Sequence, residues 1–153
     1  MFSNFRSLLF KIDPEVAHNL AIKSLKLNLT TNLFDKDKSD SMFHSNLFGK
    51  KIYNPIGIAA GFDKNAEIYN SLFKLGFGFV EAGTVTPLEQ YGKPKPRVFR
   101  LVKDQALINR LGFNNVGAEN ISNRIRSNQS KGLLGINIGP NRDSKDRLND
   151  YLI

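Results

Sequence analysis

The sequence predicts an α/β fold with a parallel sheet, because three strand-like apolar segments are separated by helical patterns. The apolar runs at residues 56–60, 78–83 and 133–139 have the length of strands, and each ends in glycine or polar residues. Between them, residues 65–75 and 116–127 carry apolar side chains three to four positions apart. This alternation favours parallel strands joined by right-handed crossovers.

The run at residues 56–60 is expected to be a buried strand that leads into a functional loop. Gly61 ends the run, and Asp63 and Lys64 follow before the next helical pattern. In parallel α/β folds, ligands bind beyond the carboxyl ends of the strands. Because the other two runs end in the same way, we expect three strand ends to meet at one site, with Lys64 as a ligand-binding candidate.

Two amphipathic patterns precede the sheet region. Residues 2–12 have helical spacing, and Asp13-Pro14-Glu15 combines an N-cap, a first-turn proline and an acid near the positive end of the helix dipole. We therefore expect a helical segment at 1–30, a polar linker at 31–43 and the sheet region at 44–153. The helical pair either packs on the sheet region, or it lies on a membrane surface and admits an apolar ligand.

Shorter elements complete the expected order. A hairpin is predicted at residues 47–52, a strand at 97–102, a polar loop at 107–115 and a helix at 150–153. The chain thus holds about three strand–helix units, whereas a closed (β/α)₈ barrel needs eight. We therefore expect the N-terminal part of a longer protein.

Composition excludes several kinds of chemistry. The chain has no cysteine and only two histidines, so disulfides, cysteine nucleophiles, zinc sites and a serine–histidine triad are poorly supported. The net charge of +8 suggests an anionic partner: a phosphorylated cofactor, a carboxylate substrate, an anionic lipid surface or a nucleic acid. A solvated basic loop would explain the same charge.

Several blocks of sequence resemble the dihydroorotate dehydrogenases. They occur in the order of that family and together cover nearly the whole chain. The blocks are Ala59-Ala60-Gly61-Phe62-Asp63-Lys64, Glu81-Ala82-Gly83-Thr84-Val85-Thr86-Pro87, Lys95-Pro96-Arg97-Val98-Phe99-Arg100, Asn109-Arg110-Leu111-Gly112-Phe113-Asn114-Asn115 and Gly135-Ile136-Asn137-Ile138-Gly139. The N-terminal pair, with Phe10-Lys11-Ile12-Asp13-Pro14-Glu15 and Ala17-His18, is similar to the membrane-associated class that reduces quinone.

This resemblance implies the N-terminal part of a (β/α)₈ TIM barrel preceded by a short helical hairpin. It implies FMN as cofactor, oxidation of dihydroorotate to orotate in pyrimidine synthesis, and ubiquinone or menaquinone as electron acceptor. Peripheral membrane association is implied as well, at the cytoplasmic side of a bacterial cell membrane or at the inner mitochondrial membrane. No nucleic acid and no metal ion are expected.

The resemblance also assigns residues. Lys64 is expected to contact both flavin and substrate. The flavin contacts implied are Ala60, Gly61, Phe62, Asp63, Lys64, Thr84 and Asn137, and the substrate contacts are Lys64, Asn109, Arg110, Leu111, Gly112 and Phe113. The catalytic base of this class is a serine that no residue here matches, so it is expected beyond Ile153.

One alternative class of function stays open at this point. Charge alone would allow a non-catalytic basic module that binds anionic membrane or nucleic acid. Nucleic-acid modules interleave exposed aromatic and basic residues. Here Phe2, Phe5, Phe73, Phe77 and Phe79 fall in helix or strand patterns that predict burial, which favours the flavoenzyme.

Overall fold

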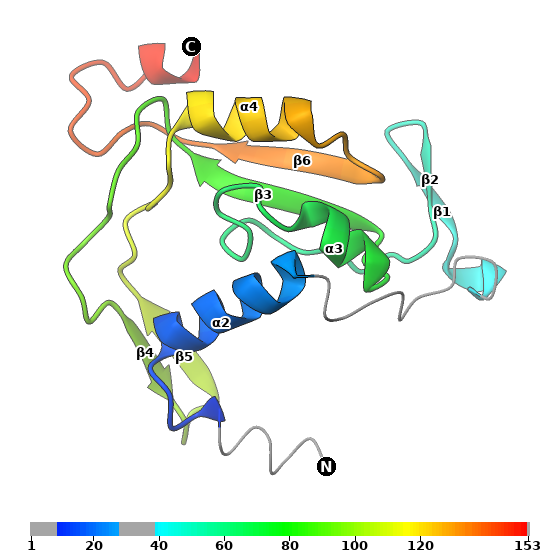
Figure 1. Cartoon of the computed structure of the whole chain (residues 1–153), viewed down its shortest axis with the longest axis horizontal. Helices are drawn as coiled ribbons and strands as arrows, with labels where there is room; N and C mark the ends of the chain where they lie inside the picture. The colour runs from blue at the N-terminus through cyan, green and yellow to red at the C-terminus, as the bar shows by residue number, and fades with distance from the viewer. Residues whose placement is uncertain (1–8, 28–38, 153) are drawn as a thin grey trace.

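The computed structural model describes residues 9–27 and 39–152 and forms a mixed α/β structure (Figure 1). Its helices are α2 (Pro14–Lys26), α3 (Tyr69–Lys74) and α4 (Ala118–Ser127), with short 3₁₀ turns η2 (Ser41–Phe43) and η3 (Asn149–Tyr151). Its strands are β1 (Ser45–Leu47), β2 (Lys50–Ile52), β3 (Phe79–Val85), β4 (Val98–Leu101), β5 (Ala106–Asn109) and β6 (Leu133–Ile138).

β3 and β6 form the parallel pair that the sequence predicts. Phe79 is opposite Leu133 and Ala82 is opposite Ile136, and the register shifts between Ala82 and Val85. The segment at residues 56–60 runs along the other side of β3. Strand positions that follow one another along the chain are therefore neighbours in space, with helices α3 and α4 between them in sequence (Figure 1).

The expectation of a regular, buried strand at residues 56–60 is wrong. Only Ile58 bridges to Val80, with its N–H 3.1 Å from the Phe79 oxygen and its oxygen 2.8 Å from the Glu81 nitrogen. Ile56 is 63% exposed. The next backbone bond to β3 runs from Gly61, so the ladder is interrupted.

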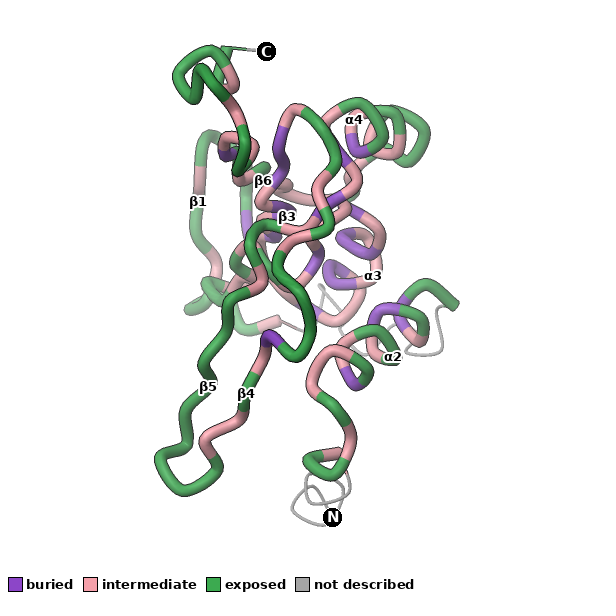
Figure 2. Tube along the Cα trace, turned by 90° about the vertical axis from the view of Figure 1, so that its left-hand side faces the viewer, coloured by how far each residue is buried: buried purple, intermediate pink, exposed green. Residues whose placement is uncertain are grey.

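The core lies between β3 and the helices. Along β3, Val80 and Ala82 point to the helical side and are buried, as the two-residue period of a strand requires. They pack in one cluster whose remaining buried members are Ile22, Leu25, Ala66, Ile68, Tyr69, Leu72, Phe73, Val85 and Ile121. Residues from α2, α3, β3 and α4 thus share one apolar core, and Figure 2 shows the buried positions gathered there.

Helix α3 begins at Tyr69 and not at residue 65 as predicted. The Asp63 carboxylate accepts the N–H groups of Glu67 at 2.7 Å and Ile68 at 2.9 Å, and Ala66 has φ +50°. These bonds hold residues 63–68 as a loop, because a side chain can offer backbone donors an alternative to helix formation.

The end of α3 follows the prediction. Gly76 has φ +100°, its N–H reaches the Phe73 oxygen at 3.1 Å, and the N–H of Phe77 reaches the Leu72 oxygen at 3.4 Å. This is the Schellman arrangement that glycine favours.

β4 and β5 form an antiparallel hairpin that stands away from the parallel pair, and Figure 2 shows how exposed it is. Val98 pairs with Asn109 and Leu101 with Ala106. The predicted polar loop at 107–115 is therefore partly wrong, because its first three residues belong to β5. The hairpin of β1 and β2, the strand β4 and the helix α4 agree with the prediction, whereas the predicted C-terminal helix is only the turn η3.

Most of the predicted first helix and most of the linker lie outside the described residues. Helix α2 agrees with its predicted start: the Asp13 carboxylate caps Glu15 and Val16, at 2.9 Å and 3.1 Å from their backbone nitrogens. Phe73 is buried and Phe77 is half-buried, as predicted. Within the described ranges, no helix has the length and apolar character needed to cross a membrane.

Candidate active site

The carboxyl ends of the three strand positions meet in space. The Gly61 N–H donates to the Gly83 oxygen at 2.8 Å, and the Gly83 N–H donates to the Asp63 oxygen at 3.0 Å. Gly83 has φ +116°, and a Cβ there would lie 2.5 Å from the Asn137 oxygen. Glycine is thus required at residue 83, and it lets the backbones after all three strand positions approach one another.

A cavity of about 240 Å³ opens at this junction. Residues 60–64, the end of β3 and the segment after β5 all contribute to its lining. Its lining residues are Ala60, Gly61, Lys64, Gly83, Thr84, Asn109, Leu111, Gly112, Phe113 and Asn114. Eight of the residues assigned from the sequence therefore lie around one space: Ala60, Gly61, Lys64, Thr84, Asn109, Leu111, Gly112 and Phe113.

Asn115 holds the segment after β5 in place. Its Nδ2 donates to the Thr86 hydroxyl and to the Phe113 oxygen, both at 2.8 Å, and its Oδ1 accepts the Gly117 N–H at 2.9 Å. Asn115 is buried, so these bonds satisfy an amide that would otherwise be costly to bury. The result is a segment at 109–113 fixed against the end of β3.

Lys64 is the ionisable residue of this cavity. Its Nζ donates to the Gly61 oxygen at 2.7 Å, within its own loop, and no described carboxylate pairs with it. Burial lowers the pKa of Lys64 from its usual 10.5, while the charge of Glu15 acts in the opposite direction. A half-buried ammonium without a carboxylate partner can attract an anionic ligand.

Thr84 and Asn137 form a polar pair between β3 and β6. The Thr84 hydroxyl donates to the Asn137 Oδ1 at 2.7 Å, and the Asn137 Nδ2 donates to the Glu81 Oε1 at 3.2 Å. Asn137 is outside the residues that line the cavity, and it contacts the site through Thr84. The pair fixes the rotamer of the Thr84 side chain at the cavity wall.

Three residues assigned from the sequence point elsewhere. Phe62 packs against the His18 ring, with the centroids 5.2 Å apart and the rings nearly perpendicular. Asp63 is buried and binds the backbone at the start of α3. Arg110 donates to the Pro96 oxygen at 3.0 Å and lies over the Phe99 ring.

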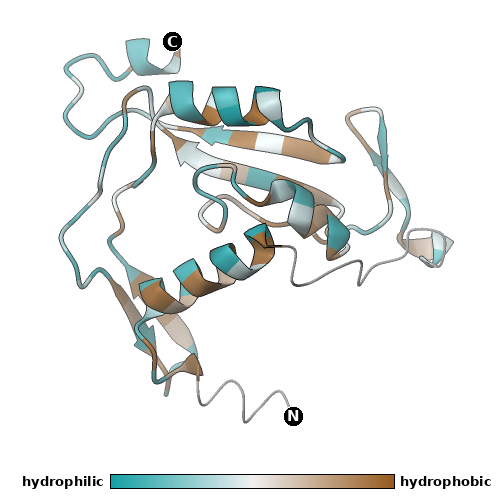
Figure 3. Ribbon diagram, viewed as in Figure 1, coloured by the Kyte–Doolittle hydropathy of each residue, from teal (hydrophilic) through white to brown (hydrophobic). Residues whose placement is uncertain are grey.

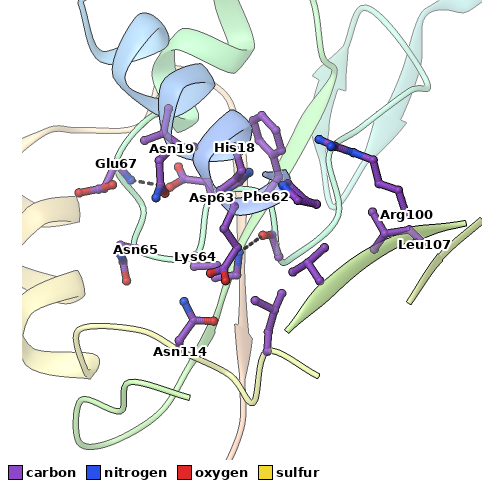
Figure 4. A pocket seen from close by; sticks show the side chains of 16 residues that line it. His18, Asn19, Phe62, Asp63, Lys64, Asn65, Glu67, Arg100, Leu107 and Asn114 are labelled. Atoms are coloured by element: carbon purple, nitrogen blue, oxygen red, sulfur yellow. Dashed lines mark hydrogen bonds between the residues drawn. The ribbon is translucent and has the colours of Figure 1, made fainter. Parts of the chain in front are cut away.

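A second cavity, of about 290 Å³, lies between α2, the loop at 61–67 and the β4–β5 hairpin. His18 and Asn19 of α2 enter it from one side, and Arg100 and Leu107 enter it from the hairpin (Figure 4). Burial, and then the charge of Lys64, lower the pKa of His18 from its usual 6.5.

Four residues line both cavities: Gly61, Lys64, Leu111 and Asn114. The sequence assignment had missed Asn114, although the matched block that includes Asn109 contains it. Its Oδ1 is buried and has no donor among the described residues. Figure 4 shows its side chain near Lys64 in the second cavity, and both residues also line the first cavity.

The match to known proteins identifies the family. The family model for dihydroorotate dehydrogenase matches residues 42–153. The chain belongs to the dihydroorotate dehydrogenase family. It is 52% identical over 147 residues to the dihydroorotate dehydrogenase (quinone) of Bartonella henselae and 49% identical over 144 residues to that of Rhodospirillum rubrum. These alignments cover 96% and 94% of this chain but 40% and 39% of the relatives.

Solved structures of the same family agree in fold. Crystal structures of DHODH from Eimeria tenella, one in complex with ferulenol and one ligand-free, superpose with TM-scores of 0.81 and 0.79 at 40% identity. The superpositions include 91% and 90% of this chain. They cover 39% and 40% of the two Eimeria tenella chains. The prediction of the N-terminal part of a (β/α)₈ barrel is therefore confirmed.

Dihydroorotate dehydrogenases are generally flavin-dependent, and the cavity is compatible with a flavin ring. Gly61 has φ +109° with open space where a Cβ would stand, so a planar group can approach its backbone. The Thr84 hydroxyl, the Asn109 amide and the unpartnered Asn114 oxygen supply polar groups around the same space. In the parts of the chain that the structure describes, no cluster of three or more potential metal ligands occurs.

Proposed function

We propose that these residues form part of an FMN-dependent dihydroorotate dehydrogenase that oxidises dihydroorotate to orotate and passes the electrons to a quinone. The observation that carries the proposal is the cavity of about 240 Å³, which combines a lysine, an asparagine and a strand-end threonine at one strand junction. The family match supports the same activity. Flavin-binding and substrate-binding residues would then share this one cavity.

Lys64 would bind the negative charge of the ligands. Its ammonium is half-buried, and its observed bond to the Gly61 oxygen keeps it at the cavity wall. FMN, when bound, would supply the acceptor for the two electrons of dihydroorotate. A fixed positive charge close to a site where negative charge develops is among the strongest contributions a protein makes to catalysis.

The segment at 109–113 would bind the substrate. The Asn109 amide has one acceptor and two donors, which suit the imide-like edge of dihydroorotate. Arg110 would contribute through its backbone, because its guanidinium is turned towards Pro96 and Phe99. Among the residues that line this cavity, the only ionisable group is Lys64, so we assign the catalytic base to a part of the enzyme outside these residues.

The second cavity would admit the quinone. It lies between α2 and the β4–β5 hairpin, and it shares the wall of Gly61, Lys64, Leu111 and Asn114 with the first cavity. Val16 and Leu20 of α2 are four residues apart and 47% and 52% exposed, which suits contact with the apolar part of a membrane surface. Figure 3 shows apolar positions along α2. Peripheral attachment to the cytoplasmic side of a bacterial cell membrane, or to the inner mitochondrial membrane, would bring ubiquinone or menaquinone to this cavity.

The test uses what we call the complete enzyme. In it, these 153 residues are followed by the rest of the (β/α)₈ barrel of a dihydroorotate dehydrogenase. The purified protein is expected to show flavin absorbance that dihydroorotate bleaches without oxygen. A short-chain ubiquinone or menaquinone should restore the absorbance, and the faster of the two identifies the acceptor. A protein that retains flavin but is not bleached by dihydroorotate would contradict the proposal.

A further inference from the structure

Helix α2 is joined to the sheet region by an ion pair between the half-buried Glu15 and the buried Arg97. The Arg97 Nε lies 3.1 Å from both Glu15 carboxylate oxygens, and its Nη2 lies 2.9 Å from Oε1. The Arg97 side chain is 8% exposed and the Glu15 side chain is 15% exposed. The hydrogen bond from Arg97 is the main cause that lowers the pKa of Glu15 below its usual 4.5. Charge-assisted bonds of this two-pronged kind are strong and set the orientation of both groups.

The other side of the same guanidinium holds the loop that precedes β4. Nη1 of Arg97 donates to the Tyr91 oxygen at 2.7 Å and to the Lys93 oxygen at 2.9 Å. The N–H of Lys93 in turn donates to the Leu111 oxygen at 3.0 Å. A chain of hydrogen bonds therefore runs from the first turn of α2 to the segment at 109–113.

A second connection passes through the backbone of Arg97. Its oxygen accepts the Arg110 N–H at 2.8 Å, one residue after Asn109. Gly92 lies between the two connections: a Cβ there would be 2.1 Å from the Leu111 oxygen and 2.8 Å from Nη1 of Arg97. The loop is thus packed closely between the guanidinium and the segment at 109–113, so we expect a displacement of Arg97 to move both.

From these contacts we infer that Glu15 is a positioning residue for the segment at 109–113, so that the docking of α2 on the sheet region sets the geometry of the dihydroorotate-facing loop. Without the Glu15 carboxylate, Arg97 is left as a buried charge without its partner, which is strongly unfavourable. The guanidinium then moves towards water or other acceptors, and the loop at 91–93 and the segment at 109–113 move with it. The inference rests on the proposed function for the identity of the ligand.

The chain offers a matched control at the other end of α2. Lys26 donates to Glu67 at 2.7 Å and also ties the helix to the sheet region, but it has no contact with the segment at 109–113. Glu67 also lies 3.8 Å from Arg124, so a cationic neighbour is expected to remain when Lys26 is replaced. Both ion pairs hold α2 on the sheet region, but only the Glu15–Arg97 pair is connected by hydrogen bonds to the segment at 109–113.

The experiment compares Glu15→Gln, Glu15→Ala and Lys26→Met in the complete, flavin-loaded enzyme. Orotate affinity is measured by calorimetry, and hydrogen exchange is followed in peptides that cover α2 and residues 109–113. Both Glu15 variants are expected to weaken orotate binding by about 5- to 100-fold and to speed exchange at 109–113. Lys26→Met is expected to speed exchange in α2 alone and to keep wild-type orotate affinity.

Two results would overturn the inference. One is faster exchange in α2 of the Glu15 variants with unchanged orotate affinity and unchanged exchange at 109–113. The other is the same weakening of orotate binding in Lys26→Met, which would mean that any loosening of α2 suffices. A wild-type enzyme that does not bind orotate would count against the proposed function instead, because hydrogen exchange still reports whether Glu15 orders the segment.

Discussion

At the residue scale, the charge of Lys64 is the most direct test of the site. Lys64→Met keeps much of the side-chain length and removes the ammonium from the cavity wall. Because loss of one preorganised electrostatic contact typically costs about 10²–10³ in kcat, we expect flavin reduction by dihydroorotate to slow by a factor in that range. Stopped-flow absorbance of the complete enzyme measures this rate directly.

Lys50→Met is the control, since Lys50 is exposed in the β1–β2 hairpin. It should reduce flavin at the wild-type rate. Near wild-type reduction by the Lys64 variant would remove Lys64 from the proposed mechanism, whatever its effect on quinone turnover.

His18 predicts a pH dependence of stability. Burial and the charge of Lys64 lower its pKa in the folded state below the usual 6.5. The unfolded chain therefore takes up the proton first as the pH falls, and the contribution of His18 to stability is present above 6.5 and is lost below it. Urea unfolding of the complete enzyme between pH 8 and pH 5.5 should show a smaller loss for His18→Phe than for wild type.

At pH 8, above the usual pKa of His18, any difference between wild type and His18→Phe reports the packing of this side chain, including its contact with Phe62. The pH-dependent part is obtained by subtracting that difference. Parallel curves for the two proteins across the whole range would mean that His18 titrates as it does in the unfolded chain.

Sequence reasoning predicted which loops form the candidate site, but it did not predict where each side chain points. Lys64 faces the cavity, whereas its neighbours Phe62 and Asp63 serve packing and the start of α3. A matched motif identifies a backbone segment, and in a tight loop successive side chains point in different directions. Asn114 lines the second cavity together with residues of α2, and no local sequence pattern predicts that α2 docks there.

At the element scale, Gly78 fixes the junction between the segment at 56–60 and β3. A Cβ at this position would lie 1.7 Å from the Asn54 oxygen, a backbone atom that cannot give way cheaply. Gly78→Ala is therefore expected to destabilise the complete enzyme by about 3 kcal/mol or more, in the range of strongly disruptive substitutions. Gly49→Ala is the comparison: it has φ +74° but open space, so it should cost only about 1–2 kcal/mol of backbone strain.

Urea denaturation measures both free energies of unfolding. Equal costs for the two substitutions would contradict the role given to the close approach at Gly78. Gly49→Ala tests strain without collision, because it stands in the exposed turn between β1 and β2.

Element types were predicted well where the pattern is long, and boundaries were predicted badly where polar side chains compete with the backbone. The helix pattern at 65–75 correctly predicted which side of the helix is buried. Its start was wrong, because the Asp63 carboxylate accepts two backbone N–H groups that were expected in the first helical turn. The strand β5 was missed because the sequence of Ala106–Asn109 does not alternate between apolar and polar residues; in the structure all four residues are exposed. Its pairing with β4 sets it as a strand, and pairing is a tertiary property.

At the scale of the whole molecule, the order of strands and helices was sufficient to predict the parallel arrangement. Parallel strands need long crossovers, and residues 86–132 between β3 and β6 provide one that also contains the β4–β5 hairpin. The hairpin's position against α2 was not predictable, since it depends on Arg97 and Arg100 contacting the start of that helix. Arg100 also lines the second cavity, between the hairpin and α2.

The open edge of the sheet predicts how the 153 residues behave when they are produced alone. The outer edge of β6 has no partner strand in the described sheet, and Ile56, Ile136 and Ile138 are 63%, 40% and 56% exposed. An open edge and apolar surface of this kind favour association between chains. We expect the purified chain to elute as oligomers or aggregates in size-exclusion chromatography with light scattering, and to show no flavin absorbance. A yellow, monomeric 153-residue protein would mean that the open edge is compatible with a stable fold and that these residues suffice to hold FMN.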